Sequence, residues 1–146
     1  MAMPAESKVS SERDVQVASD AAAAFGRAFT DGDHDGFLQM LADDVGYEVP
    51  SVIQHTVKKL HGRDEVRLYL EETTSEYHRV DVTPRKIRDL GGGRFLMTGW
   101  WRAEPRHSVT PFGTPIAAVL DIHDGKVVRL RAFFDEELAI AASRRD

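Results

Sequence analysis

The chain of 146 residues contains no cysteine. This absence excludes a disulfide framework, a thiol nucleophile and a zinc–thiolate site, and it is typical of a cytoplasmic protein. The sequence also lacks a long apolar run, so no membrane contact is predicted. Residues 1–10, MAMPAESKVS, lack the apolar stretch of a secretory signal and are predicted to form a loose tail. Residues 11–146 suffice for a single domain with a substantial core.

An excess of positive charge is missing as well. The 24 acidic residues outnumber the 19 basic ones, the net charge is −5 and the basic residues are scattered, so no nucleic-acid partner is expected. The six histidines form no HExxH motif, and no metal is predicted. The glycines at 91–93 precede no predicted helix, which excludes a phosphate-binding loop. We expect no cofactor.

Hydrophobic periodicity predicts the secondary structure. Ser11 and Asp14 resemble a capping box, Pro84 predicts an edge strand or a bulge, and Asp135 predicts a helix cap. The expected order is a helix (11–30), a short helix from about 33, a strand (44–49), an ambiguous loop or short helix (51–60), a helix from 62, four strands (77–90, 94–104, 115–123, 126–134) and a last helix. This order predicts an α+β fold with the helices on one face of a mostly antiparallel sheet.

The last two strands carry the clearest alternation. One apolar face consists of Ile116, Ala118, Leu120 and Ile122, and the other of Val128, Leu130, Ala132 and Phe134. A two-residue loop, Asp124-Gly125, would place arginines on the apolar face. A three-residue loop over 123–125 would pair Leu120 with Val128 and make the apolar faces coincide, so we predict the longer loop.

Three segments resemble the SnoaL-like branch of the nuclear-transport-factor-2-like superfamily, which includes the ketosteroid isomerases. They read AFTDGDHDGFLQMLADDVGYEVP, LHGRDEVRLYL and DGKVVRLRAFFDEE, and the resemblance extends over about 20–142. It implies a strongly curved sheet wrapped on helices, forming a cystatin-like cone with an internal pocket. Members include isomerases, epoxide hydrolases, polyketide cyclases and binding domains without chemistry, so the fold alone does not give the function.

The acid–base residues of the best-known members are absent from the matching positions. The isomerases' tyrosine, general base and second acid would fall at Phe25, Val49 and Ala118, and the epoxide hydrolases' arginine and two aspartates at Gly99, Trp101 and Ala132. The cyclase base would also fall at Ala132. Only a tyrosine, Tyr47, remains of these sets.

The inward-facing residues predict an apolar pocket for a hydrophobic small molecule. Its predicted lining is Phe25, Tyr47, Val49, Leu70, Met97, Trp101, Ala118, Leu120, Ala132 and Phe134. Tyr47 and Trp101 offer flat surfaces with one donor each, although a core role explains either residue equally well.

Three residues are candidates for catalysis: Tyr47, His55 and His107. The resemblance places His55 at the pocket rim, where a histidine can move protons near neutral pH. An exposed loop histidine is the simpler interpretation. His107, in the loop 105–114, is the weaker candidate. Glu48 points away from Tyr47 by alternation and is expected at the surface or at a subunit interface.

Two functions stay open. One is an enzyme that isomerises, cyclises or hydrates a polyketide-, terpenoid- or steroid-like compound. The other, favoured by the missing acids, is a module that binds a hydrophobic ligand without chemistry, and a dimerisation domain with a filled interior is a third possibility. Phe95, Trp100 and Phe133 are expected on the convex sheet face, where we predict a homodimer interface.

Overall fold

The computed structural model describes residues 9–50, 57–107 and 110–145. The described elements are α2 (Glu12–Thr30), α3 (His34–Leu38), β1 (Leu41–Pro50), β2 (Val57–His61), α4 (Arg63–Glu76), β3 (Tyr77–Gly91), β4 (Arg94–Pro105), β5 (Phe112–His123), β6 (Lys126–Phe133) and α5 (Glu136–Ser143). The order confirms the α+β class. None of the described helices is long and apolar enough to cross a membrane.

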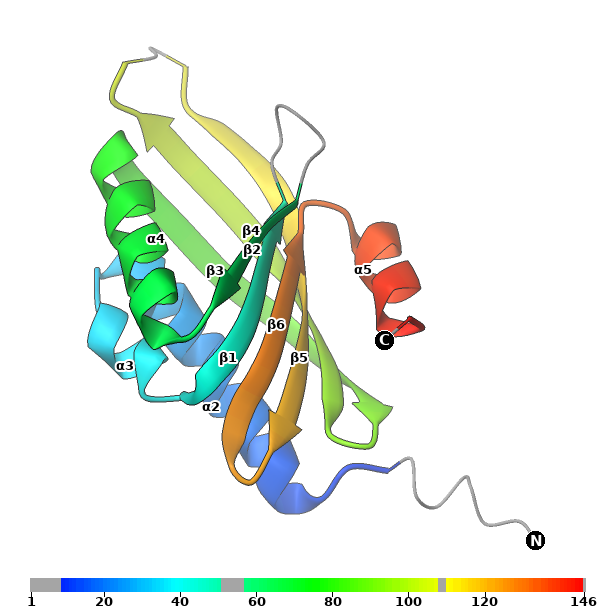
Figure 1. The fold of residues 1–146 in the computed structure, drawn as a ribbon. Helices are drawn as coiled ribbons and strands as arrows, with labels where there is room; N and C mark the ends of the chain where they lie inside the picture. The colour runs from blue at the N-terminus through cyan, green and yellow to red at the C-terminus, as the bar shows by residue number, and fades with distance from the viewer. Residues whose placement is uncertain (1–8, 51–56, 108–109, 146) are drawn as a thin grey trace, which may run out of the picture.

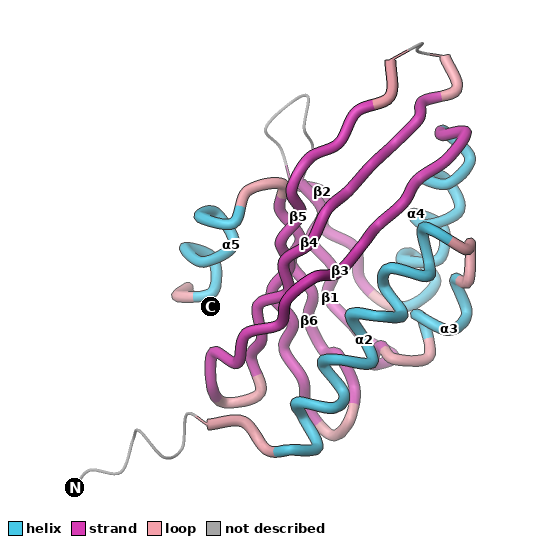
Figure 2. Tube along the Cα trace, turned by 180° about the vertical axis from the view of Figure 1, so that it is seen from behind, coloured by secondary structure: helices cyan, strands magenta, loops and turns pink. Residues whose placement is uncertain are grey.

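The strands form one curled sheet in the order β2-β1-β6-β5-β4-β3. Neighbouring strands are antiparallel except β1 and β6, which run parallel. Figures 1 and 2 show from opposite sides how the sheet curls around α2, α3 and α4. The curved, mostly antiparallel sheet is therefore confirmed, with β2 and β3 as its edge strands.

Helix α2 lies across the concave face and supplies one side of the main core. Ser11 caps it by accepting a hydrogen bond from the Asp14 amide at 3.1 Å, as the capping-box pattern predicts. A stripe of residues at helical spacing is buried against the sheet: Ala18, Ala22, Phe25 and Phe29. The helix ends at Thr30, and Gly32 follows in the left-handed region with φ 71°.

The last helix, α5, lies on the convex face, opposite α2, α3 and α4 (Figures 1 and 2). Its Ala139 and Ile140 form a separate apolar cluster with Leu96, Ala117 and Val119. The expectation that all helices gather on one face is therefore wrong. The alternation of β5 contained the signal, because Ala117 and Val119 are apolar residues on the face that was expected to be polar.

Two arginines hold the carboxyl end of α5 against the sheet. Arg131 of β6 is 3% exposed and donates to the Ala142 carbonyl oxygen at 2.8 Å. Arg94 of β4 donates to the Ser143 carbonyl oxygen at 2.7 Å and to both carboxylate oxygens of Asp121. Cations at the carboxyl end of a helix oppose the negative end of its dipole, so both contacts favour docking.

The hairpin between β5 and β6 departs from the predicted register. Asp124 and Gly125 form a two-residue turn with φ values of 51° and 78°, and the next pair, Ile122 with Val127, is in register. A register shift between Ile122 and Asp121 then brings Leu120 opposite Leu130. The three-residue loop is therefore wrong. A tight turn followed by a bulge makes the apolar faces coincide, because one extra residue in β6 flips all later side chains.

Two further expectations are corrected by strand pairing. The segment 51–60 was expected to be a loop or a short helix. Its described residues, 57–60, belong to strand β2, which pairs with β1. Phe95 is 1% exposed and pairs with Leu120 in the main core, so it does not lie on the convex face. Alternation with Met97 and Trp101 on β4 already places it inward. Trp100, on the convex face, is 36% exposed.

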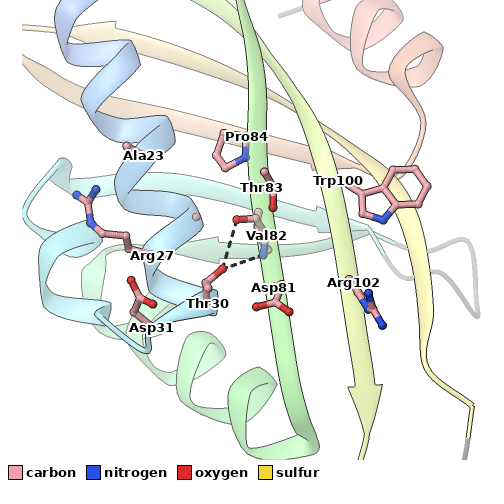
Figure 3. A pocket seen from close by; sticks show the side chains of 11 residues that line it. Ala23, Arg27, Thr30, Asp31, Asp81, Val82, Thr83, Pro84, Trp100 and Arg102 are labelled. Atoms are coloured by element: carbon pink, nitrogen blue, oxygen red, sulfur yellow. Dashed lines mark hydrogen bonds between the residues drawn. The ribbon is translucent and has the colours of Figure 1, made fainter.

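Helix α2 seals the edge strand β3 (Figure 3). Pro84 interrupts the ladder of β3, and the register shifts between Pro84 and Lys86, as Pro84 predicts. The Thr30 hydroxyl accepts from the Val82 amide at 3.0 Å and donates to the Val82 carbonyl at 3.3 Å. A side chain at Gly26 would lie 2.9 Å from Pro84, so glycine allows the close approach. The edge is thereby protected against pairing with another chain.

Ser10 anchors the start of the described chain to the turn between β3 and β4. Its hydroxyl donates to Asp89 at 2.6 Å and accepts from the Gly93 amide at 3.0 Å. Its own amide donates to the second oxygen of Asp89 at 3.1 Å. The last residue of the predicted tail is thus 9% exposed and bonded to the sheet.

We expect Ser10→Ala to lower the free energy of unfolding by about 2 kcal/mol, because the buried Gly93 amide loses its acceptor. Urea denaturation followed by circular dichroism measures the change. Val9→Ala is the control, since Val9 is 74% exposed and its loss should leave the midpoint unchanged. An unchanged midpoint for Ser10→Ala would show that the anchor contributes nothing.

Candidate functional site

An enclosed hollow lies between α2, α4 and the concave side of the sheet. We call it the aromatic chamber, and its walls are Phe25, Phe29, Tyr47, Val49, Tyr69, Trp101, Ile116, Ala132, Phe133 and Phe134. Its volume is about 10 Å³, which is room for about one water molecule. The side chains therefore almost fill the predicted pocket.

Edge-on contacts between rings form the walls of the chamber. Phe25 and Phe29 of α2 have ring centroids 5.3 Å apart, and Phe29 lies 5.0 Å from Trp101 of β4. Trp101 in turn lies 5.8 Å from Phe134. Tilted rings at such distances attract through their quadrupoles, so the walls are held by specific geometry as well as by burial.

The structure brings together six of the ten residues predicted to line a pocket: Phe25, Tyr47, Val49, Trp101, Ala132 and Phe134. The other four, Leu70, Met97, Ala118 and Leu120, are buried in the core behind the walls. Four lining residues were not predicted as such: Phe29, Tyr69, Ile116 and Phe133. The sequence contained a signal for the first three, because each faces inward by periodicity, whereas Phe133 was expected on the convex face.

Two positions that the resemblance matches to acidic residues hold alanine: Ala132 in the wall of the chamber and Ala118 in the core behind it. Ala118 and Ala132 lie directly opposite each other on β5 and β6, with 0% and 6% of their surface exposed. Their methyl groups leave this part of the concave face apolar. Alternation predicted both as inward, and the structure confirms that placement.

Tyr47 and Tyr69 supply the phenol groups of the chamber. Tyr47 is 1% exposed, and its ring lies 5.8 Å from that of Tyr69. Burial, and then the nearby Tyr69, raise the pKa of Tyr47 well above its usual value. Burial raises the pKa of Tyr69 to about 12, against a lowering contribution from its bond to Thr73. Both phenols are neutral donors at pH 7.

Among the residues that the structure describes, the lining contains no acid, no histidine and no basic residue. His55 lies outside the described residues. His107 is exposed and follows the end of β4. The last residue of β4, Pro105, is about 13 Å along the strand from Trp101 of the chamber, so His107 lies away from the walls. Glu48 faces outward and accepts from Arg129 at 3.0 Å. No group of three potential metal ligands occurs among the residues described.

The chamber reaches solvent where its lining is only half-buried. Val49 of β1, Tyr69 of α4 and Phe134 are partly exposed, whereas Phe25, Tyr47 and Trp101 are buried. Phe134 belongs to the short connection between β6 and α5. We call Val49, Tyr69 and Phe134 the mouth of the chamber; Phe133 is also half-buried but packs against the separate cluster on the convex face.

Larger hollows exist on the surface and are more open to solvent than the chamber. Figure 3 shows one of about 480 Å³, with Arg27 and Asp31 of α2 on one side of β3 and Trp100 and Arg102 on the other. Another, of about 550 Å³, lies between the end of α5 and the turn joining β3 to β4. The aromatic chamber remains the candidate site.

The buried phenols predict a loss of stability at high pH. The unfolded chain releases these protons near pH 10, whereas the folded chain holds the Tyr69 proton to about pH 12. The stability is thus fully present below about pH 10 and declines as the pH rises from there toward 12. We expect urea midpoints measured between pH 9 and 11.5 to fall less steeply for Tyr47→Phe than for the wild type.

Tyr77→Phe is the matched control for this measurement. Burial raises the pKa of Tyr77 too, but that side chain is only partly buried and lies outside the chamber. Its loss should therefore change the slope less. Equal slopes for wild type and Tyr47→Phe would mean that Tyr47 ionises as a solvated phenol does.

Comparison with known proteins agrees with this geometry. The family model of the SnoaL-like domain matches residues 22–130, and no curated protein matches the chain. A proposed polyketide cyclase from Xanthomonas campestris pv. campestris superposes with a TM-score of 0.70 at 20% identity, covering 88% of this chain and 97% of that one.

Two further structures were determined with a small molecule. A protein of ketosteroid isomerase-like fold from Catenulispora acidiphila, in complex with trimethylamine, has a TM-score of 0.70 at 19% identity, with 86% of this chain and 92% of that one covered. TerC, co-crystallised with polyporic acid, has a TM-score of 0.68 at 18% identity, with coverage of 91% and 97%. Identities this low show a shared fold, and the family match shows that the chain belongs to the SnoaL-like family.

Proposed function

We propose that the chain binds a flat, hydrophobic small molecule in the aromatic chamber, where Tyr47 donates a hydrogen bond to a carbonyl group of the ligand. The observation that carries this proposal is the composition of the walls. They combine six aromatic rings other than Phe133 with aliphatic side chains and no charge. Aromatic walls favour flat apolar ligands, and a phenol hydroxyl among such walls favours a ligand that offers an acceptor.

Two proteins of the same fold support binding in general. TerC was crystallised with polyporic acid, and the Catenulispora protein with trimethylamine. These ligands differ in size and charge, so they do not define the ligand of this chain. They are consistent with a fold that holds small molecules.

Binding requires the mouth to open, because the volume of the chamber is about 10 Å³. Phe134 is the residue most suited to move. It is half-buried, lies outside β6 and α5, and contacts Trp101 through one ring edge. Rotation of one such side chain needs no change in the ladder of the sheet. We propose that Phe134 turns outward when a ligand enters.

We test binding with 2-naphthamide, a neutral flat probe with one carbonyl group, by isothermal titration calorimetry. Tyr47→Phe should weaken binding about fivefold, the loss of a hydrogen bond of about 1 kcal/mol. Ala132→Leu should abolish binding by filling the wall. Leu68→Ala is the control, since Leu68 is 56% exposed on α4. If Ala132→Leu binds the probe as tightly as the wild type does, the probe binds elsewhere and the proposal that the chamber is the binding site is wrong.

A catalytic role is the second candidate, with isomerisation, cyclisation or hydration of a polyketide-, terpenoid- or steroid-like compound. The neutral phenol of Tyr47 favours it, because such a donor can polarise a carbonyl. The described walls offer no base, so proton transfer would depend on His55, whose role stays a prediction, as does that of His107. Mass spectrometry of a compound incubated with the protein distinguishes the two functions. A product that forms with the wild type but not with His55→Ala supports catalysis, whereas recovery of the unaltered compound supports binding alone.

We also propose a homodimer that uses the convex face beside α5. Trp100 is the large aromatic residue left exposed on that face of β4, and the Arg85 guanidinium lies 5.9 Å from its ring. Trp100→Glu should shift the mass from dimer to monomer in light scattering at micromolar concentration. A monomeric wild type would contradict the dimer. A cytoplasmic location also stays a prediction.

A further inference from the structure

Lys58 is a charged residue on the concave face of the sheet. It lies on β2 directly opposite Val49 of β1, a residue of the mouth, and its neighbour Leu60 lies opposite the buried Tyr47. Opposite residues of an antiparallel pair project to the same face. The side chain of Lys58 accordingly reaches α4, where its Nζ lies 6.0 Å from the centroid of the Tyr69 ring. Lys58 thus adjoins two of the three mouth residues.

The ammonium group of Lys58 has no carboxylate partner among the residues described. Glu48, next to Val49 on β1, is on the other face of the sheet and pairs with Arg129. The contact with the Tyr69 ring is at the outer limit for a cation–π interaction and leaves the charge largely unbalanced. The mouth therefore carries one positive charge beside walls that carry none.

We propose that Lys58 is the counter-ion for an anionic group of the ligand, so that the ligand is a flat hydrophobic carboxylate. This inference rests on the proposed function, because it concerns the same chamber. The apolar body enters between the rings, and the carboxylate stays at the mouth, where water and Lys58 solvate it. Burying the carboxylate instead would cost far more, since the walls offer it no cation.

The arrangement also sets the direction in which a ligand binds. The Tyr47 hydroxyl lies inside and serves a neutral acceptor, whereas the lysine lies outside and serves a charge. A molecule with a carboxylate at one end and an apolar body at the other has one favourable orientation. A neutral molecule gains nothing from Lys58.

The test compares 2-naphthoate with 2-naphthamide, two probes of the same shape that differ in charge. Calorimetric titrations use the full chain and three variants: Lys58→Met, Lys58→Arg and Lys59→Met. Lys59 is the matched control, because it lies opposite Glu48 and so projects to the other face of the sheet. Lys58→Met should weaken binding of the naphthoate about fivefold, the upper range for a half-exposed ion pair, and leave the naphthamide unchanged.

Lys58→Arg should retain the preference for the naphthoate, and Lys59→Met should change neither probe. Added salt should reduce the preference in the wild type. Equal weakening of both probes by Lys58→Met, or no weakening of either, overturns the role of Lys58 while the chamber itself stands. If neither probe binds the wild type, the proposed function fails and this inference fails with it.

Discussion

The edge-on packing of α2 against the concave face of the sheet sets the shape of this molecule. Phe29 meets Trp101 with ring centroids 5.0 Å apart, and Phe25 extends the contact to Phe37 of α3. Because these rings separate the helix from the sheet by the thickness of an aromatic side chain, the sheet curls around them. The aromatic chamber is what remains between this ring cluster, Tyr47 and Tyr69. Its small volume is a direct result of the same packing.

The two faces of β6 link the chamber to α5. Ala132 faces the chamber, while its neighbour Arg131 faces outward and bonds to the carbonyl of Ala142 in α5. Phe134 follows one residue after the strand and just before Asp135, whose side chain caps α5 by accepting from the Leu138 amide. The backbone of Phe134, the residue proposed to turn outward, is therefore fixed on both sides, by the ladder of the sheet before it and by the docked helix α5 after it. Among the described residues, Nε and Nη2 of Arg131 form no hydrogen bond, although Nη2 lies 4.0 Å from a carboxylate oxygen of Asp121.

Local patterns in the sequence predicted the features that local chemistry determines. Capping by Ser11 and Asp135, the buried stripe of α2 and the inward placement of Ala118 depend on neighbours along the chain, and all are confirmed. Features that depend on distant partners were missed. The register shift between Ile122 and Asp121 adds one residue to β6, which simple alternation along one strand does not predict. Strand β2 is defined by its pairing with β1, a contact between two segments of the chain. The face of the sheet on which Lys58 lies follows only from its pairing with Val49. The sequence of the two neighbouring lysines alone does not place Lys58 near the mouth.

The polar groups around the chamber are suited to hold and orient a ligand rather than to transfer a proton. A carboxylate at Ala118 or Ala132 would lie under the rings, where the described walls supply no cation, so its ionised form would be costly. With alanine there, the inner wall offers a ligand only shape and neutral hydroxyl donors. Burial keeps these donors protonated by raising the pKa of Tyr47 and Tyr69, so they can hold an acceptor but cannot remove a proton. With the cation Lys58 beside the mouth, the described polar groups suit the orientation of the proposed ligand, and proton transfer would depend on a residue outside the described walls.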